Sequence, residues 1–140
     1  MPGIGRIAPM LDPEKSIFVA FAPIAGGAAP PYAPGRFVWE RLRTADVAAA
    51  AEFYAATFGW QVIVDEGGGV VDVDGRRVAE LVPDVASGWL PFVRVEHLAD
   101  ACQRVIALGG TADEPVLWQG TSCYALVRDP QGVPLAVHAE

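Results

Sequence analysis

Residues 36–60, RFVWERLRTADVAAAAEFYAATFGW, contain the local signals that decide the fold of this chain. The alternating stretch Phe37–Arg43 predicts a β-strand. The alanine-rich stretch after it predicts a helix over Asp46–Phe58, and a side-chain oxygen of Thr44 or Asp46 can cap its first turn. The glycine that follows the helix favours its termination, because glycine readily adopts the left-handed conformation common at helix C-termini.

The same order recurs later in the chain, where Leu90–Val95 predicts a strand and Leu98–Leu108 a helix. Short strands are expected after the helices, at Gln61–Val64, Val70–Val73, Arg77–Val82, Glu114–Trp118, Cys123–Arg128 and Val133–His138, with the glycines Gly67, Gly68 and Gly69 between the first two. Each copy is too small to bury its apolar face alone. We therefore predict an α+β fold, in which paired βαβββ modules form a curved mixed β-sheet with helices on its outer face.

Residues 1–35 do not follow this plan. Ile4–Leu11 and Ser16–Ala22 resemble a β-hairpin, and its Asp12-Pro13 turn falls on Asp129-Pro130 when it is laid on the C-terminal hairpin. This segment is either a ragged extension or a hairpin that adds to a sheet edge, in this subunit or a neighbour; we expect the second. The expected organisation is a hairpin extension over 1–22, a Pro/Gly-rich linker over 23–35 and a domain over 36–140.

Composition narrows the classes of partner. Hydrophobic residues make up 52% of the chain and its mean hydropathy is +0.30, which suffices for a core. No uninterrupted apolar stretch is long enough to span a membrane, so no membrane partner is expected. A net charge of −7 without a basic run makes nucleic acid a poor partner. Cys102 and Cys123 have no metal or redox spacing, and we expect a cytoplasmic protein.

The chain resembles the glyoxalase/bleomycin resistance protein/dioxygenase superfamily, the vicinal oxygen chelate fold. The motifs that carry the resemblance are Arg36–Leu42, Asp46, Phe53-Tyr54, Phe58-Gly59-Trp60, Trp89–Val95, Leu108-Gly109-Gly110 and Arg128-Asp129-Pro130-Gln131-Gly132. Residues 1–22 resemble the last hairpin of a preceding module in tandem-domain members. The resemblance also implies a homodimer.

The superfamily's enzymes hold a divalent metal with His and Glu side chains, and this sequence departs from that pattern. The positions that match three of the ligands are Trp39, Leu90 and Ala136, which offer no lone pair to such a cation. Glu80 is the nearest carboxylate for the remaining position. Other possible ligands are Glu40, His97 and His138. Metal-dependent catalysis of the usual kind is therefore not expected, and no metal or other cofactor is predicted.

Strand parity places aromatic, basic and apolar side chains together on the inner face. The predicted ligand-binding residues are Trp39, Arg41, Leu90, Phe92, Arg94, Ala136 and His138. Such a face is unlike a dry core and suits a pocket for a flat or apolar ligand. We predict a metal-free protein that binds a small organic molecule between the modules, for sequestration or sensing. The alternatives are a lyase, isomerase or dioxygenase with an altered metal site, and a structural or regulatory subunit whose trough is filled.

Overall fold

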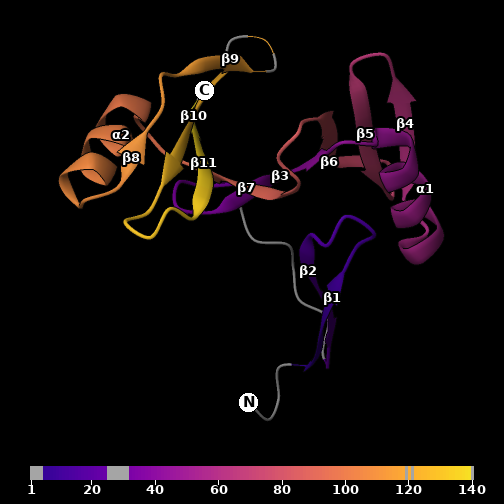
Figure 1. The fold of residues 1–140 in the computed structure, drawn as a ribbon. Helices are drawn as coiled ribbons and strands as arrows, with labels where there is room; N and C mark the ends of the chain where they lie inside the picture. Colours follow the sequence, from indigo (N-terminus) through magenta and orange to yellow (C-terminus); the bar gives the residue numbers. More distant parts are fainter. Residues whose placement is uncertain (1–4, 25–31, 119, 121, 140) are drawn as a thin grey trace. The chain divides into compact units, whose positions relative to one another are not determined.

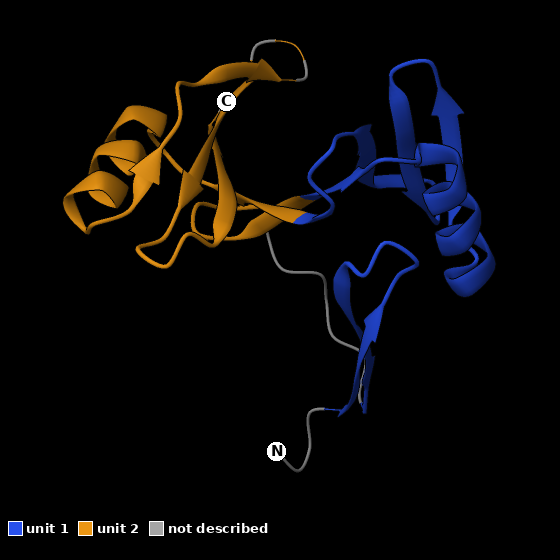
Figure 2. Cartoon of the chain, in the orientation of Figure 1, with its two compact units in different colours: residues 1–29, 40–89 blue, residues 30–39, 90–140 orange. Residues whose placement is uncertain are grey.

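A computed structural model describes residues 5–24, 32–118, 120 and 122–139 of the chain (Figure 1). The chain divides into two units, which Figure 2 colours separately. The first unit comprises residues 1–29 and 40–89, and the second comprises residues 30–39 and 90–140. Among the described residues, no helix is long and apolar enough to cross a membrane.

The first unit contains the first module and the N-terminal hairpin. Its elements are β1 (Gly5–Leu11), β2 (Ile17–Pro23), β3 (Phe37–Thr44, which begins in the second unit), α1 (Val47–Phe58), β4 (Gln61–Asp65), β5 (Gly68–Val73) and β6 (Arg76–Pro83). The module's strands are paired in the order β4-β5-β6-β3, with β3 parallel to β6 and the other pairs antiparallel. The predicted strand–helix–strands plan of this module is confirmed.

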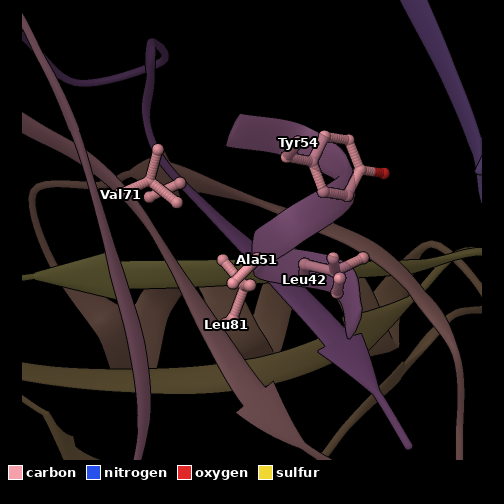
Figure 3. Close-up of a cluster of buried hydrophobic side chains, with 7 residues drawn as sticks. Leu42, Ala51, Tyr54, Val71 and Leu81 are labelled. Carbon is pink, nitrogen blue, oxygen red and sulfur yellow. The ribbon is translucent and has the colours of Figure 1, made fainter. Parts of the chain in front are cut away.

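Helix α1 begins and ends where its sequence predicts. The Asp46 side chain accepts a hydrogen bond from Ala49 N at 2.9 Å and so caps the first turn. Gly59 adopts a φ of 70° and ends the helix, with its N–H bonded to Ala55 O. The helix covers one face of the module, where a buried cluster includes Leu42, Ala51, Tyr54, Val71 and Leu81 (Figure 3).

The second unit repeats the plan with one strand more than predicted. Its elements are β7 (Gly88–Arg94, which begins in the first unit), α2 (Leu98–Ala107), β8 (Thr111–Ala112), β9 (Val116–Trp118), β10 (Ser122–Arg128) and β11 (Pro134–Ala139). β11 is parallel to β7 and antiparallel to β10, which also pairs with β8 and β9. Helix α2 packs on Ala125, Val127 and Val137. The predicted α+β class with paired βαβββ modules is therefore confirmed.

The glycine-rich segment after β4 was predicted to lie between strands, and this is wrong for Gly68 and Gly69. Both belong to β5 and are buried. A Cβ at Gly68 would lie 2.3 Å from Leu81 O, and its φ is 144°. Glycine is used here because a neighbouring backbone approaches closely, so the segment forms part of the strand.

The N-terminal hairpin repeats the turn of the C-terminal one. Asp12 N donates to Ser16 O (3.1 Å), as Asp129 N donates to Val133 O (3.1 Å). In each turn the aspartate Oδ1 also accepts from the N–H four residues later, at 2.8 Å for Ser16 and 2.9 Å for Val133. Lys15 has a φ of 68°, and the residue in its place in the other turn is a glycine with a φ of 86°. The predicted likeness of the two turns is confirmed.

Within the described part of the chain, the hairpin does not extend the edge of another sheet. Strands β1 and β2 pair with each other in a separate two-stranded sheet. The prediction of edge pairing within the subunit is therefore wrong for the described residues, because side-chain packing attaches the hairpin instead. Pairing with a neighbouring subunit stays a prediction. Ile4 and residues 25–31 of the predicted linker lie outside the described residues.

Candidate functional site

An aromatic side chain attaches the hairpin to helix α1. Phe18 of β2 meets three rings of α1 edge-on, and the ring centroids lie 6.4 Å from Phe53, 5.6 Å from Tyr54 and 5.7 Å from Phe58. Edge-to-face pairs of this kind add to the apolar area that the contact buries. The alternating pattern of β2 turns Phe18 toward the helix and leaves Val19 and Phe21 on the opposite face of the strand.

A buried hydrogen-bond chain fixes the hairpin turn. Trp89 Nε1 donates to Tyr54 Oη at 2.9 Å, and Tyr54 Oη donates to Asp12 Oδ2 at 3.0 Å. The other oxygen of Asp12 accepts from Ser16 N. Burial raises the pKa of Tyr54, so its hydroxyl stays protonated as a donor. These hydrogen bonds join the hairpin turn, α1 and β7 within the first unit.

A second polar contact holds the turn at the start of α1. Thr44 Oγ1 donates to Glu14 Oε1 at 2.8 Å, and the backbone N–H groups of Ala45 and Asp46 donate to the same carboxylate at 3.3 Å. The hydrogen bond from Thr44 lowers the pKa of Glu14. These contacts, with those of Tyr54, fix the hairpin on the module and define the space beside it.

That space is a cleft of about 980 Å³ within the first unit. The hairpin forms one wall of the cleft. Residues of β3, α1 and β7, together with Trp60 just after α1, form the rest. The lining residues are Arg6, Ile7, Ala8, Ile17, Phe18, Val19, Ala20, Phe21, Ala22, Glu40, Tyr54, Phe58, Trp60 and Trp89. Apolar and aromatic side chains predominate, and Glu40 is the acidic residue among them. The sequence alone did not identify this site, because parity does not reveal what the hairpin covers.

Glu40 is a carboxyl group in apolar surroundings. It makes no hydrogen bond or ion pair with any residue that the structure describes. Burial raises the pKa of Glu40 to about 7, because the cleft solvates its charged form poorly. Near neutral pH the group can therefore accept a proton or pair with a positive charge. The sequence indicated Glu40 as a possible metal ligand and did not place it in a cleft of this kind.

Replacing Glu40 with glutamine is expected to raise the free energy of unfolding at pH 8 and to change it little at pH 4.5. The wild-type carboxyl has a pKa of about 7 in the folded protein and an ordinary pKa of 4.5 in the unfolded chain. Its favourable contribution to stability is therefore complete below pH 4.5 and is lost as pH rises through 7. Water reaches this group and reduces the effect. The expected increase in the free energy of unfolding at pH 8 is therefore about 1–2 kcal/mol. Urea unfolding at both pH values measures it.

The exposed Glu52 of helix α1 gives a matched control for this measurement. Glu52→Gln changes the net charge of the same unit equally, and it should change stability by less than about 0.5 kcal/mol at either pH. A Glu40→Gln variant that is no more stable than the Glu52→Gln variant at pH 8 would show that water solvates Glu40 fully.

Six of the predicted ligand-binding residues lie in the second unit. Leu90, Phe92 and Ala136 form one buried apolar cluster, and His138 beside them is also buried. Trp39 packs against this cluster. The two predicted arginines lie in different units. Arg94 belongs to the second unit, where its Cζ lies 4.3 Å from the ring centroid of Tyr32, whereas Arg41 belongs to the first unit.

Side chains from β9, β10 and the segment before β3 cover this face. The ring of Trp118 lies 4.8 Å from that of Phe92 and 5.2 Å from that of His138, and Tyr32 Oη lies 3.4 Å from His138 Nε2. The expectation that this face would not resemble a core is therefore wrong: four of its side chains are at most 2% exposed. Trp118 supplies a cover that strand parity could not indicate. Ligand binding by these residues stays a prediction.

The residues present do not fit a metal ion of the superfamily's kind. Trp39, Leu90 and Ala136 carry no donor. Glu80, the carboxylate closest to the fourth position, accepts from Arg41 Nε at 2.7 Å in an ion pair. In the described ranges no three His, Cys, Asp or Glu side chains gather in a group that could hold a metal.

Comparisons with known proteins agree with the fold. The family model "Bleomycin resistance protein-like N-terminal" matches residues 36–75. A superfamily member from Vibrio splendidus matches with a TM-score of 0.56 and 18% identity over 73% of this chain and 97% of its own. Methylmalonyl-CoA epimerase from Mycobacterium tuberculosis matches with a TM-score of 0.54 and 18% identity over 73% of this chain and 85% of its own. The fold is thus one of paired βαβββ modules.

The family match over residues 36–75 and the shared fold agree with the resemblance to the glyoxalase/bleomycin resistance protein/dioxygenase superfamily that the sequence motifs predicted. A curated relative is the anthracycline biosynthesis protein DnrV from Streptomyces peucetius, which is 26% identical over 145 residues. The alignment covers 96% of this chain and 53% of DnrV. This chain therefore spans about half the length of the curated relative it matches.

Proposed function

We propose that this protein binds a flat, apolar organic molecule in the cleft of the first unit, without a metal ion, and so sequesters or senses it. The observation that carries the proposal is a cleft of about 980 Å³ with aromatic walls and a carboxylate among them. Small-molecule sites have this range of size and this pattern of many apolar groups around few polar ones. Phe58, Trp60 and Trp89 offer ring faces and edges on which a planar ligand can stack.

The relative DnrV supports a planar ligand. It is named for anthracycline biosynthesis, and a fused aromatic ring system has the flat, apolar shape that the cleft suits. DnrV is longer than this chain, so its activity is not carried over. A homodimer and a cytoplasmic location stay predictions.

Metal-free binding is tested separately from ligand binding. Equilibrium dialysis against Zn²⁺, Ni²⁺, Mn²⁺ and Fe²⁺ should leave less than stoichiometric metal on the protein, since the expected ligand positions carry no donor. Stoichiometric binding of any of these ions that changes ligand affinity would instead favour a metal-dependent lyase, isomerase or dioxygenase.

A neutral polycyclic probe, hydroxymethylanthracene, should bind saturably with one molecule per chain. Phe21 lines the cleft and is 51% exposed, so Phe21→Ala removes a ring from the wall with little loss of stability. Loss of one aromatic contact should weaken binding roughly 5- to 10-fold. Probe fluorescence, excited by energy transfer from the tryptophans, measures the affinity.

The control for this experiment is Phe37→Ala. Phe37 is 63% exposed and does not line the cleft, so this substitution removes the same ring from another surface. Affinity for the probe should stay within about twofold of wild type. Equal losses in the two variants, or no saturable binding by the wild-type chain, would refute the proposed site.

A further inference from the structure

We infer that the cleft selects ligands that carry a protonated amine beside their apolar rings, with the Glu40 carboxylate as the partner of the ammonium group. This inference rests on the proposed function and names the class of ligand that the same site would take.

Glu40 is a side-chain acceptor with unused capacity in the wall of the cleft, as far as the described residues show. Tyr54 Oη already accepts from Trp89 and donates to Asp12. The indole N–H of Trp60 can only donate. Glu40 has no partner among the residues that the structure describes, although it lies in the wall of the cleft. A ligand donor can therefore reach a carboxylate that no protein group competes for.

The free-energy cost of a partly buried, unpaired carboxylate is the reason to expect that the cleft prefers a positively charged ligand. A partly buried charge without a partner is unfavourable, and an opposite charge within a few ångströms offsets this. Burial raises the pKa of Glu40 to about 7, which shows that its charged form is poorly solvated in the cleft. An ammonium group would stabilise the charged form with an opposite charge as well as a hydrogen bond, whereas a hydroxyl could donate a hydrogen bond but would bring no charge.

The aromatic walls of the cleft also favour a positively charged ligand. The rings of Phe58, Trp60 and Trp89 line it, and aromatic faces attract cations. Arg6 of β1 also lines the cleft and would favour an anion, but it is exposed to solvent, which screens its charge. We therefore place the preference with Glu40, and the experiment includes an anionic probe to test this choice.

The test compares three probes with the same ring system at pH 8: aminomethylanthracene, hydroxymethylanthracene and anthracene carboxylate. The amine should bind wild-type protein about 10-fold more tightly than the alcohol, and the carboxylate should bind most weakly. In Glu40→Gln the ratio of amine to alcohol affinity should fall close to one. Glu52→Gln, which removes an exposed carboxylate outside the cleft, should keep the 10-fold ratio.

The outcomes separate the inference from the function on which it rests. If amine and alcohol bind equally, or if the carboxylate binds best, the inference is overturned and the proposed function stands. An amine preference that survives Glu40→Gln also overturns it. If no probe binds the wild-type chain, the proposed function fails and the inference fails with it. Circular dichroism of each variant shows whether it is folded.

Discussion

Phe92→Ala is expected to lower the free energy of unfolding by about 3–5 kcal/mol, the range for removing a buried aromatic side chain. Phe92 is 0% exposed, and its ring centroid lies 4.8 Å from that of Trp118 and 5.2 Å from that of Tyr124. Removing the ring would leave a cavity between rigid neighbours that cannot close around it. Urea unfolding followed by far-ultraviolet circular dichroism measures the loss.

The matched control is again Phe37→Ala, in the same unit but at a position 63% exposed. It should change stability by no more than about 0.5 kcal/mol. If Phe92→Ala costs less than about 1 kcal/mol, Phe92 does not contribute to a core. The face of β7 and β11 would then regain its predicted role as the wall of a ligand pocket.

Local signals predicted the elements of the fold well. Asp46 caps α1 and Gly59 ends it, as the residue types require. The Asp12 and Asp129 turns share their hydrogen bonds because both depend on an aspartate that accepts from its own turn. These features arise from neighbours in sequence, so one sequence suffices to predict them.

The side chains that pack over each sheet face could not be predicted from local signals. Parity correctly grouped Leu90 and Phe92 on one face, yet it did not show that Trp118 would close that face. It also did not show that Phe18 would pack on α1 and leave a cleft beside Glu40. Such contacts join residues far apart in sequence, and no local pattern specifies them.

The apolar character of the hairpin was the available signal for the cleft. Ile7 and Ile17, like Val19 and Phe21, lie on the face of the hairpin opposite Phe18 and are more than half exposed. A two-stranded ribbon that is apolar on both faces needs a partner on each of them, because isolated hairpins are marginally stable. In the first unit the face that carries Phe18 packs on α1, and the cleft lies beside this contact.

The hydrogen-bond chain through Tyr54 gives the second large prediction. Tyr54→Phe is expected to lower the free energy of unfolding by about 2–3 kcal/mol, although it removes one oxygen atom. The substitution leaves the buried Asp12 with one hydrogen bond fewer, and Trp89 Nε1 loses its acceptor. The control is Tyr32→Phe, because Tyr32 is exposed and its hydroxyl lies 3.4 Å from His138 Nε2, a longer contact than either bond of Tyr54.

The part of the molecule that loses stability shows whether Tyr54 acts through its hydrogen bonds or through general packing of the core. Since Asp12 belongs to the hairpin turn, Tyr54→Phe should increase hydrogen exchange of the β1 and β2 amides more than that of β5 and β6. The double variant Asp12→Asn/Tyr54→Phe should cost less than the sum of the single changes, because each change removes the same contact. Uniform exchange across the first unit, or strict additivity, would show that Tyr54 stabilises the protein through its ring alone.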